Sequence, residues 1–236
     1  MSGSLARRVT AEAVGSGFLV AVVVGSGIFA QRLSPGAPGL QLLENSTATA
    51  AGLVALILAL GSVSGAHFNP VVTLADRIYG GLTTREALAY VAAQLAGACV
   101  GAVTANTMFD LSPVTFSTHE RASAGLWLGE VVATFGLVLV ILGVVRAGRT
   151  AAAPYAVAGY IAAAYWFTSS TSFANPAVTA GRTLTDTFAG IAPGSAPAFV
   201  AAQLAGAVAA IALARFLFPT HAPVDLVVTH DHADAA

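Results

Sequence analysis

The sequence has no lysine, one cysteine and little charge of either sign. Its ten cationic side chains are all arginine, and charged residues make up 9% of the 236 positions. A soluble domain carries about a quarter charged residues, so this composition argues against one. A net charge of −1 without a basic cluster gives no support to a nucleic-acid partner. The single Cys99 excludes a disulfide framework or a cysteine-based metal site within one chain.

Long apolar segments take the place of that missing charge. Hydrophobic residues make up 56% of the chain, and the mean hydropathy is +0.79. Six segments approach the length that crosses a bilayer, and they are 9–30, 46–64, 87–109, 126–146, 151–169 and 197–218. The first follows Arg7 and Arg8 as in a signal peptide, but it is long enough to span, and we treat it as the first span. The sequence therefore predicts a multi-pass protein in a lipid bilayer.

Two shorter apolar segments, 69–78 and 175–186, each begin with an asparagine and a proline. They read Asn69-Pro70-Val71 and Asn175-Pro176-Ala177. A capping asparagine before a proline at the first helical position predicts a helix start. Non-helical backbone at membrane depth is tolerated only when it is buried in protein or lines a water-filled cavity. We therefore expect two half-helices whose N-termini face a pore.

The two halves of the chain repeat one another. Residues 90–98 return as 199–207 with an almost unchanged sequence, and the order glutamate, Asn-Pro, glutamine occurs in both halves. The repeats are expected at 1–110 and 111–220, each with three spans and one half-helix, in a single functional domain. Three is an odd number, so the halves must have opposite topology in the membrane.

The predicted fold is an all-α membrane protein with six transmembrane helices and two half-helices that meet at the midplane. A cytoplasmic tail at 221–236 is expected to be disordered. Arginine placement predicts the orientation, because cytoplasmic loops carry the excess of positive charge. With a cytoplasmic N-terminus, three arginines lie outside and seven inside, the latter being Arg7, Arg8, Arg77, Arg85, Arg146, Arg149 and Arg215. Both termini are therefore expected in the cytoplasm and the protein in the plasma membrane.

The motifs resemble those of the major intrinsic protein family, the aquaporins and aquaglyceroporins. The resemblance rests on Ser-Gly-Ala-His-Phe-Asn-Pro at 64–70 and Asn-Pro-Ala at 175–177, and it covers about residues 8–218. It implies a right-handed helical bundle, one pore per subunit, a homotetramer, and passive flow of water or small uncharged solutes. Opposed helix N-termini would repel protons and other cations at the midplane, and Asn69 and Asn175 would each offer amide N–H groups to a passing oxygen.

The chain departs from the family pattern at the outer constriction. The family usually has an arginine three residues after the second motif asparagine, and here this residue is Val178. The usual family spacing places Thr49, Ala163 and Ser172 at the other constriction positions. Such a ring is wide, mildly polar and uncharged, and it is expected to pass solutes larger than water. If Trp166 or Phe167 enters the constriction instead, strict water selectivity stays possible.

Arg182 lies one helical turn beyond Val178. One interpretation is that it moves the positive charge from the constriction to the outer mouth. The alternative is a surface arginine that pairs with Asp186 or with lipid headgroups.

The segments 166–178 and 184–191 are most similar to aquaglyceroporins encoded with bacterial arsenic-resistance genes. That similarity implies conduction of arsenite as neutral As(OH)3 beside glycerol-like solutes. The ranking of water, glycerol and arsenite stays open.

Three ionisable side chains of the expected membrane region are candidates for a structural or functional role. Glu12 and Glu130 occupy equivalent positions in the repeat, which favours structural support through backbone N–H bonds to the half-helix loops. The resemblance implies that His67 lines the cytoplasmic half of the pore, where its protonation is one route to gating and an ordinary packing role is the other.

Other functions were weighed against the channel. A secondary active transporter also uses inverted repeats, and its coupling site would have to be Glu12 and Glu130. An enzyme is not expected, because the spans contain no nucleophile-base pair and no metal-ligand cluster, and neither a cofactor nor a metal is expected. Histidines and aspartates of the tail, from His221 to Asp234, are interpreted as solvated rather than metal-binding.

Overall fold

The computed structural model describes residues 4–218, and the tail predicted at 221–236 lies outside the described residues. Regular structure between residues 4 and 218 is helical. The elements in order are α1 (Leu5–Leu33), α2 (Pro38–Ser64), α3 (Pro70–Tyr79), α4 (Thr84–Met108), α5 (Ala124–Arg146), the 3-10 helix η1 (Thr150–Ala152), α6 (Ala153–Phe167), α7 (Pro176–Arg182) and α8 (Ala196–Leu217).

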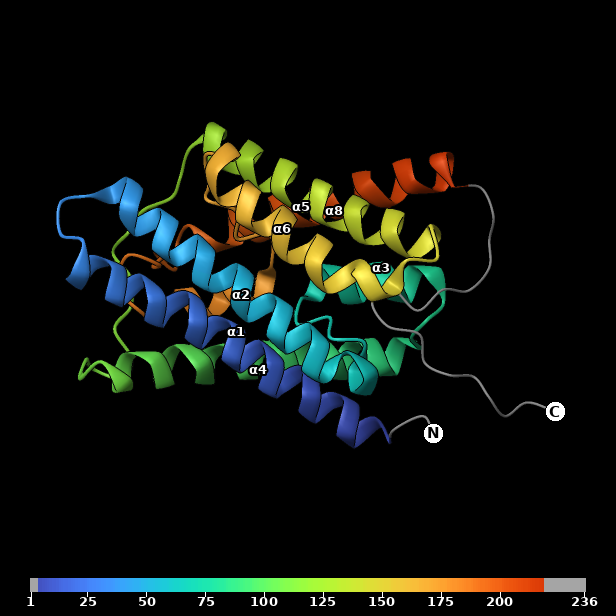
Figure 1. Ribbon diagram of the computed structural model, residues 1–236, viewed down its shortest axis with the longest axis horizontal. Coiled ribbons are helices and arrows are strands. Elements are labelled where there is room, and N and C mark those ends of the chain that lie inside the picture. The colour runs from blue at the N-terminus through green and yellow to red at the C-terminus, as the bar shows by residue number, and fades with distance from the viewer. Residues whose placement is uncertain (1–3, 219–236) are drawn as a thin grey trace.

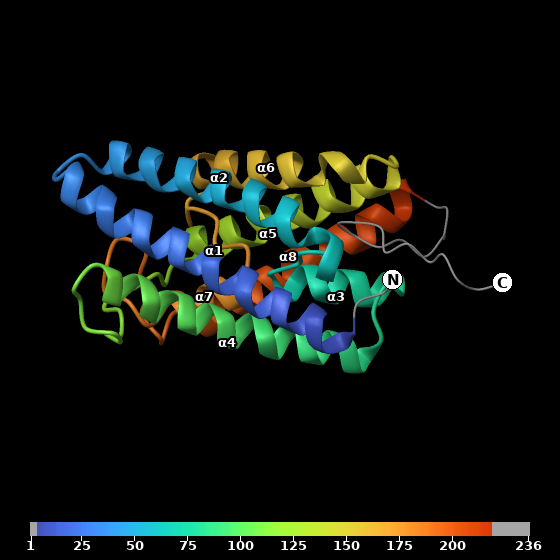
Figure 2. The ribbon, with the colours of Figure 1, turned by 60° about the horizontal axis from the view of Figure 1, so that its bottom comes forward.

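The helices form one bundle in which the short α3 and α7 lie among long neighbours (Figures 1 and 2). Helix α1 packs against α4 and α2, and α5 packs in the same way against α8 and α6. The start of α1 and the end of α8 lie at one end of the bundle, near α3, which we call the α3 end (Figure 2). We call the opposite end, where α1 ends and α5 begins, the α7 end (Figure 1).

Local capping chemistry sets the helix boundaries nearest the centre of the bundle. Asn69 caps α3 and Asn175 caps α7, each through its side-chain oxygen, and a proline follows at the first helical position. Helix α2 ends at Gly65, which has a φ of 86°, a left-handed conformation that glycine adopts without strain. The chain therefore leaves α2 in a sharp turn and enters the loop that leads to α3.

Glycines bring α1 close to α4 and α5 close to α8. A Cβ atom on Gly97 would lie 2.0 Å from the carbonyl oxygen of Ala13, and one on Gly206 would lie 2.4 Å from that of Val131. Helices in lipid associate largely through van der Waals contact, which small residues at the crossing increase. These two contacts therefore show that each crossing depends on a residue without a side chain.

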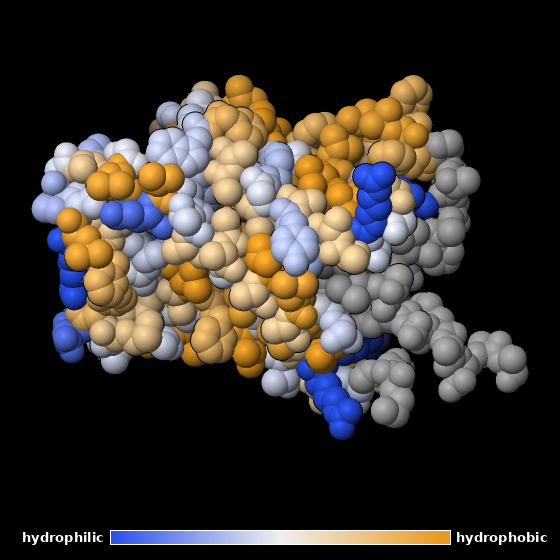
Figure 3. Space-filling model, viewed as in Figure 1, coloured by the Kyte–Doolittle hydropathy of each residue, from blue (hydrophilic) through white to orange (hydrophobic). Residues whose placement is uncertain are grey.

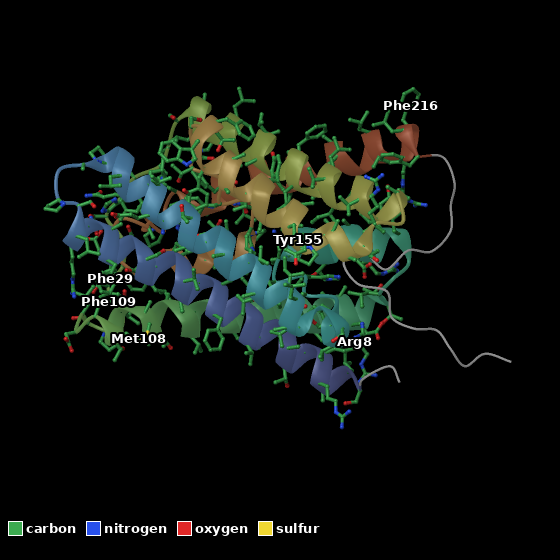
Figure 4. All side chains as sticks on the ribbon, viewed as in Figure 1. Arg8, Phe29, Met108, Phe109, Tyr155 and Phe216 are labelled. Atoms are coloured by element: carbon green, nitrogen blue, oxygen red, sulfur yellow. The ribbon has the colours of Figure 1, made fainter. Side chains whose placement is uncertain are left out.

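The outer surface is apolar, as lipid contact requires. Helices α1, α2, α4, α5 and α8 are long and apolar enough to cross a membrane. Hydrophilic residues gather near the two ends of the face seen in Figure 3, and apolar residues dominate between them. Side chains such as Tyr155 of α6 and Phe216 of α8 are 60% and 82% exposed, and Phe216 points away from the bundle (Figure 4). Exposed apolar side chains on this scale indicate contact with lipid rather than water.

Some predicted boundaries were wrong. Helix α2 begins eight residues before the predicted 46, and α6 has only 15 residues because η1 precedes it. The second half-helix was expected to reach residue 186 but ends at Arg182. It ends there because the next two carbonyls, of Thr183 and Leu184, accept hydrogen bonds from the backbone N–H groups of Ser117 and Thr115.

The glycine crossings can be tested with a matched pair of substitutions. Gly97→Ala should lower stability by about 1–3 kcal/mol, because the added methyl group overlaps a backbone carbonyl. Gly159→Ala on α6 adds its methyl group to open space and should be neutral or slightly stabilising. Thermal unfolding of both variants in detergent, followed by size-exclusion chromatography, measures the difference. Equal melting temperatures would contradict the proposed crossing.

Candidate pore between the two half-helices

Asn69 and Asn175 face one another where α3 and α7 begin. The Nδ2 atom of Asn69 donates to the carbonyl of Ala174 at 2.8 Å, and the Nδ2 atom of Asn175 donates to that of Phe68 at 2.8 Å. Each asparagine thus bonds the loop that leads into the opposite half-helix. These two reciprocal bonds join the halves of the chain at the centre of the bundle.

The amide geometry leaves one donor of each asparagine for the pore. The side-chain oxygen of Asn69 accepts from the Val71 N–H, and that of Asn175 accepts from the N–H groups of Ala177 and Val178. An asparagine amide has two N–H donors, and the crossing bond uses one of them. The second N–H is available to an oxygen atom in the cavity that both residues line.

The loops before the half-helices hold a strained backbone at equivalent positions. Ala66 and Phe68 have φ values of 50° and 48°, and Ser172 and Ala174 have values of 52° and 48°. A residue with a Cβ atom costs about 1–2 kcal/mol in this left-handed region. Other interactions must therefore hold both loops in this conformation.

Two buried carboxylates supply those interactions. Glu12 accepts from the backbone N–H groups of His67 and Phe68 at 3.0 and 2.7 Å. Glu130 accepts from those of Phe173 and Ala174 at 2.8 and 2.9 Å. Both glutamates are 0% exposed, and neither lines the cavity. The backbone bonds expected from the repeat are therefore present.

Each carboxylate is held in turn by a glutamine. Gln94 donates to Glu12 and to the hydroxyl of Thr73 on α3, at 2.7 and 2.8 Å. Gln203 donates to Glu130 and to the hydroxyl of Thr179 on α7. A chain of side-chain hydrogen bonds therefore connects a long helix, a loop and a half-helix in each half of the molecule.

One cavity passes both asparagines and extends toward each end of the bundle. Its middle is walled by apolar side chains from α1, α2, α5 and α6, namely Leu19, Val23, Leu53, Ile57, Leu137, Ile141, Val157 and Ile161. Of the residues singled out in the sequence, seven line it: Thr49, His67, Asn69, Ser172, Asn175, Val178 and Arg182. Pro70, Val71, Pro176 and Ala177 belong to the half-helices and do not line it.

The expectation for the α6 side of the constriction was wrong. Ala163 is exposed on the outer face of α6, whereas Tyr165 lines the cavity in phase with Ile161 and Val157, four and eight residues earlier. The Tyr165 hydroxyl lies 3.2 Å from the Thr49 hydroxyl across the α2–α6 contact. An aromatic side chain therefore lines the cavity where an alanine was expected.

The aromatic side chains considered as an alternative point elsewhere. Trp166 and Phe167 are 51% and 56% exposed and do not line the cavity. The helical period of α6 carried the signal for Tyr165, because residues 157, 161 and 165 recur every four positions on one face. The family spacing pointed to Ala163 instead. It was misleading because the number of residues between the end of α6 and the half-helix is not fixed by local chemistry.

Arg182 is buried at the α7 end of the cavity. It is 2% exposed, and its guanidinium carbon lies 3.4 Å from the centroid of the Phe173 ring. Its Nε atom donates to the carbonyl of Ala189. Position 178 thus has no positive charge, but Arg182 supplies one a helical turn further along, in the lining of the same cavity.

Asp186 has other partners than the one suggested for it. It accepts hydrogen bonds from the backbone and side chain of Thr118, and His119 lies 3.7 Å away. The Thr118 N–H bond holds the pKa of this exposed carboxyl below its usual value. The surface pair between Arg182 and Asp186 that was weighed as an alternative is therefore wrong.

His67 lines the α3 half of the cavity beside a carboxylate that the sequence analysis missed. Its Nδ1 atom lies 3.1 Å from the Thr73 hydroxyl, and its Nε2 atom lies 4.0 Å from a carboxylate oxygen of Asp76. Asp76 is 3% exposed and shares a face of α3 with Asn69 and Thr73, at spacings of seven and three residues. That spacing was readable in the sequence, but only carboxylates of the full spans were considered.

Nothing in the described part of the chain offers a metal centre. Between residues 4 and 218, no group of three or more histidine, cysteine, aspartate or glutamate side chains could hold a metal ion. The histidines of the tail lie outside the described residues.

Comparisons with known proteins bear on the whole chain. A family model described as Major intrinsic protein matches residues 1–169. Aquaglyceroporin AqpS of Rhizobium meliloti (strain 1021) is 52% identical over 220 residues, which cover 93% of this chain and 94% of AqpS. Probable aquaporin AqpM of Archaeoglobus fulgidus is 32% identical over 250 residues, which cover 92% of this chain and 99% of AqpM.

A solved structure supports the same fold. The aquaglyceroporin from Plasmodium falciparum superposes with a TM-score of 0.63, covering 93% of this chain and 98% of that one, at 21% identity. At this identity the likeness concerns the fold alone. The bundle is thus an all-α membrane channel fold.

The buried carboxylates can be tested by removing their acceptor oxygens. Glu130→Ala leaves the N–H groups of Phe173 and Ala174 buried without partners, at a cost of about 1–3 kcal/mol each. Glu130→Gln keeps one acceptor oxygen and should lose less. The yield of monodisperse protein and its melting temperature in detergent measure both effects, with Glu120→Ala in an exposed loop as the control. If Glu130→Ala were as stable as this control, the loop would not depend on the carboxylate.

Proposed function

Because the chain belongs to the major intrinsic protein family, we propose that it is a passive channel for glycerol-like polyols, arsenite as As(OH)3 and water. The family consists of channels and not of enzymes. The single observation that best supports the proposal is the cavity that runs from Arg182 past both asparagine amides to His67. The likeness to an aquaglyceroporin over most of both chains favours polyols among the solutes.

A solute would cross in single file and exchange hydrogen bonds only at polar positions. In the middle of the cavity, one N–H of Asn69 and one of Asn175 would donate to a hydroxyl or water oxygen. The positive ends of α3 and α7 would orient each passing oxygen toward the asparagines and repel cations. The apolar walls would contact the carbon backbone of a polyol. They would offer no hydrogen-bond partner to a hydronium ion.

The constriction is proposed to comprise Thr49, Tyr165, Ser172 and Val178, with Arg182 at the outer mouth. It combines the hydroxyl groups of Thr49, Tyr165 and Ser172 with the apolar surface of Val178. A polyol has both hydroxyl and C–H groups, so it could form hydrogen bonds and apolar contacts there at the same time. An arginine at position 178 would replace the apolar side with a bulky donor.

A water-selective channel is the alternative, and one observation favours it. Tyr165 and Arg182 bring an aromatic ring and a guanidinium group to the same cavity, which narrows the opening and adds charge. Measuring glycerol and water permeation on the same vesicles separates the two candidates, because a water-selective pore would give no glycerol flux above that of empty vesicles.

A secondary active transporter is less favoured, because its coupling carboxylates would have to exchange protons or ions during transport. Glu12 and Glu130 are fully buried, do not line the cavity and hold backbone N–H groups. Glycerol flux that depends on a proton or sodium gradient would favour this candidate over the channel.

The assembly and orientation are also proposals. We propose a homotetramer in the plasma membrane with both termini, and hence the α3 end, in the cytoplasm. The family resemblance supports the tetramer, and the seven arginines at the α3 end against three at the α7 end support the orientation.

The constriction can be tested with Val178→Arg. A second guanidinium beside Arg182 should fill the apolar side and lower glycerol flux about tenfold or more, an increase of about 1.4 kcal/mol in the barrier. Water flux should fall less, because water is smaller. Stopped-flow swelling of proteoliposomes measures both rates, and Val178→Ala, which keeps an apolar side chain, is the control. Unchanged glycerol flux in Val178→Arg would exclude Val178 from the constriction.

A further inference from the structure

Two arginines from different parts of the chain approach one aromatic ring at the α7 end. Arg182 closes α7, and Arg121 comes from the segment between α4 and α5. Their guanidinium carbons lie 3.4 and 5.1 Å from the centroid of the Phe173 ring. The two segments that follow α4 and α7 come together at this end of the bundle (Figure 2). Two positive charges therefore lie close together beside the constriction.

Consecutive backbone carbonyls hold both guanidinium groups. The Nε atom of Arg182 donates to the carbonyl of Ala189, and the Nε atom of Arg121 donates to that of Gly190 at 3.0 Å. The backbone N–H of Arg121 also donates to the Ser195 hydroxyl at 3.0 Å. Both side-chain bonds use only the Nε atoms, so between residues 4 and 218 the terminal nitrogens of both groups have no hydrogen-bond acceptor.

No carboxylate pairs with either cation in the described part of the chain. The ion pairs there are Arg8–Glu86, His67–Asp76 and His119–Asp186. Glu130, on α5, interacts electrostatically with both guanidinium groups but forms no ion pair with either, and its oxygens accept from two backbone N–H groups and Gln203. Burial of a charge without a counterion in direct contact is costly. A small anion beside Arg182 would offset that cost.

The constriction adds a hydroxyl group that lacks a partner. Ser172 is 3% exposed, lines the cavity with Arg182, and its Oγ atom has no hydrogen bond to any residue from 4 to 218. The Thr49 and Tyr165 hydroxyls line the same cavity. A guanidinium group binds two oxygens of an oxyanion through parallel N–H bonds, and a nearby hydroxyl can donate to a third.

We propose that the α7 end of the pore is a binding site for a small monovalent oxyanion, formed by Arg182 and Ser172 and reinforced by the charge of Arg121. The bound anion occupies the path of neutral solutes and slows their flux. It does not pass readily, because the apolar wall beyond it offers no partner to a negative charge. This site rests on the proposed channel function, since it is detected as competition with a conducted solute.

Inorganic phosphate is a suitable probe at a mildly acidic pH, where the monoanion predominates. Glycerol flux is measured by stopped flow in proteoliposomes with potassium phosphate or potassium chloride on both sides, at equal ionic strength. Flux should fall with phosphate concentration, by about twofold where half of the sites are occupied. Arg182→Gln should abolish this inhibition, and Ser172→Ala and Arg121→Gln should weaken it.

A matched control separates the site from general surface charge. Arg32 lies in the last turn of α1, at the same end of the bundle, and is exposed. It donates to the carbonyl of Phe109 and does not line the cavity. Arg32→Gln should keep the full inhibition by phosphate. Arg182→Lys keeps the charge and loses the planar pair of donors, so it should bind phosphate more weakly than the unaltered channel and more tightly than Arg182→Gln.

The outcomes distinguish the two proposals. Absence of glycerol flux in chloride would overturn the proposed channel for polyols. Normal flux in chloride with no effect of phosphate would overturn the anion site alone, and so would equal inhibition in Arg182→Gln and the unaltered protein. If Arg182→Gln does not fold, unchanged inhibition in both Ser172→Ala and Arg121→Gln overturns the site.

Discussion

The structure depends on two buried carboxylates that hold the backbone of the loops before the half-helices. A fully buried glutamate is costly unless its oxygens are hydrogen-bonded, and Glu12 and Glu130 each accept at least three such bonds. These bonds hold non-glycine residues in the left-handed region, which places Asn69 and Asn175 face to face. Because the carboxylates satisfy the loop N–H groups, the asparagine side chains are not needed for that purpose. The oxygen of each amide can therefore cap its half-helix, and one N–H can bond the loop of the opposite half. The other N–H still faces the cavity as a donor.

A comparable arrangement supports the displaced arginine. Arg182 is held by an aromatic face and a backbone carbonyl rather than by an acid, so its charge is fixed in place without being neutralised. The ending of α7 at this residue follows from the next two carbonyls, which bond the segment between α4 and α5. The same pairing brings Arg121 toward Phe173. Helix termination and the charge at the mouth therefore have one structural cause.

The sequence predicted what local chemistry and repetition determine. Asparagine followed by proline fixes a helix start within a residue or two, so α3 and α7 begin where expected. The repeat related Glu12 to Glu130, and their bonds to the loops followed from that relation. The prediction that Ala163 lines the constriction was wrong. It depended on the number of residues between α6 and Asn175, which tertiary packing decides. Asp76 was missed for a different reason, since a carboxylate on a half-helix was not considered.

The charges along the cavity explain how a pore without arginine at position 178 could still exclude ions. Under the proposed function, Arg182 at one end repels cations, and the two half-helix N-termini repel them again at the centre. Anions are attracted by Arg182 and then meet apolar walls that offer them no partner. Each sign of charge thus meets an unfavourable region along the path. A neutral polyol meets no unfavourable region. Its oxygens can form hydrogen bonds with the hydroxyl groups of the proposed constriction and with the asparagine amides at the centre. Selectivity for neutral solutes then follows from the order of charges along the pore rather than from one residue.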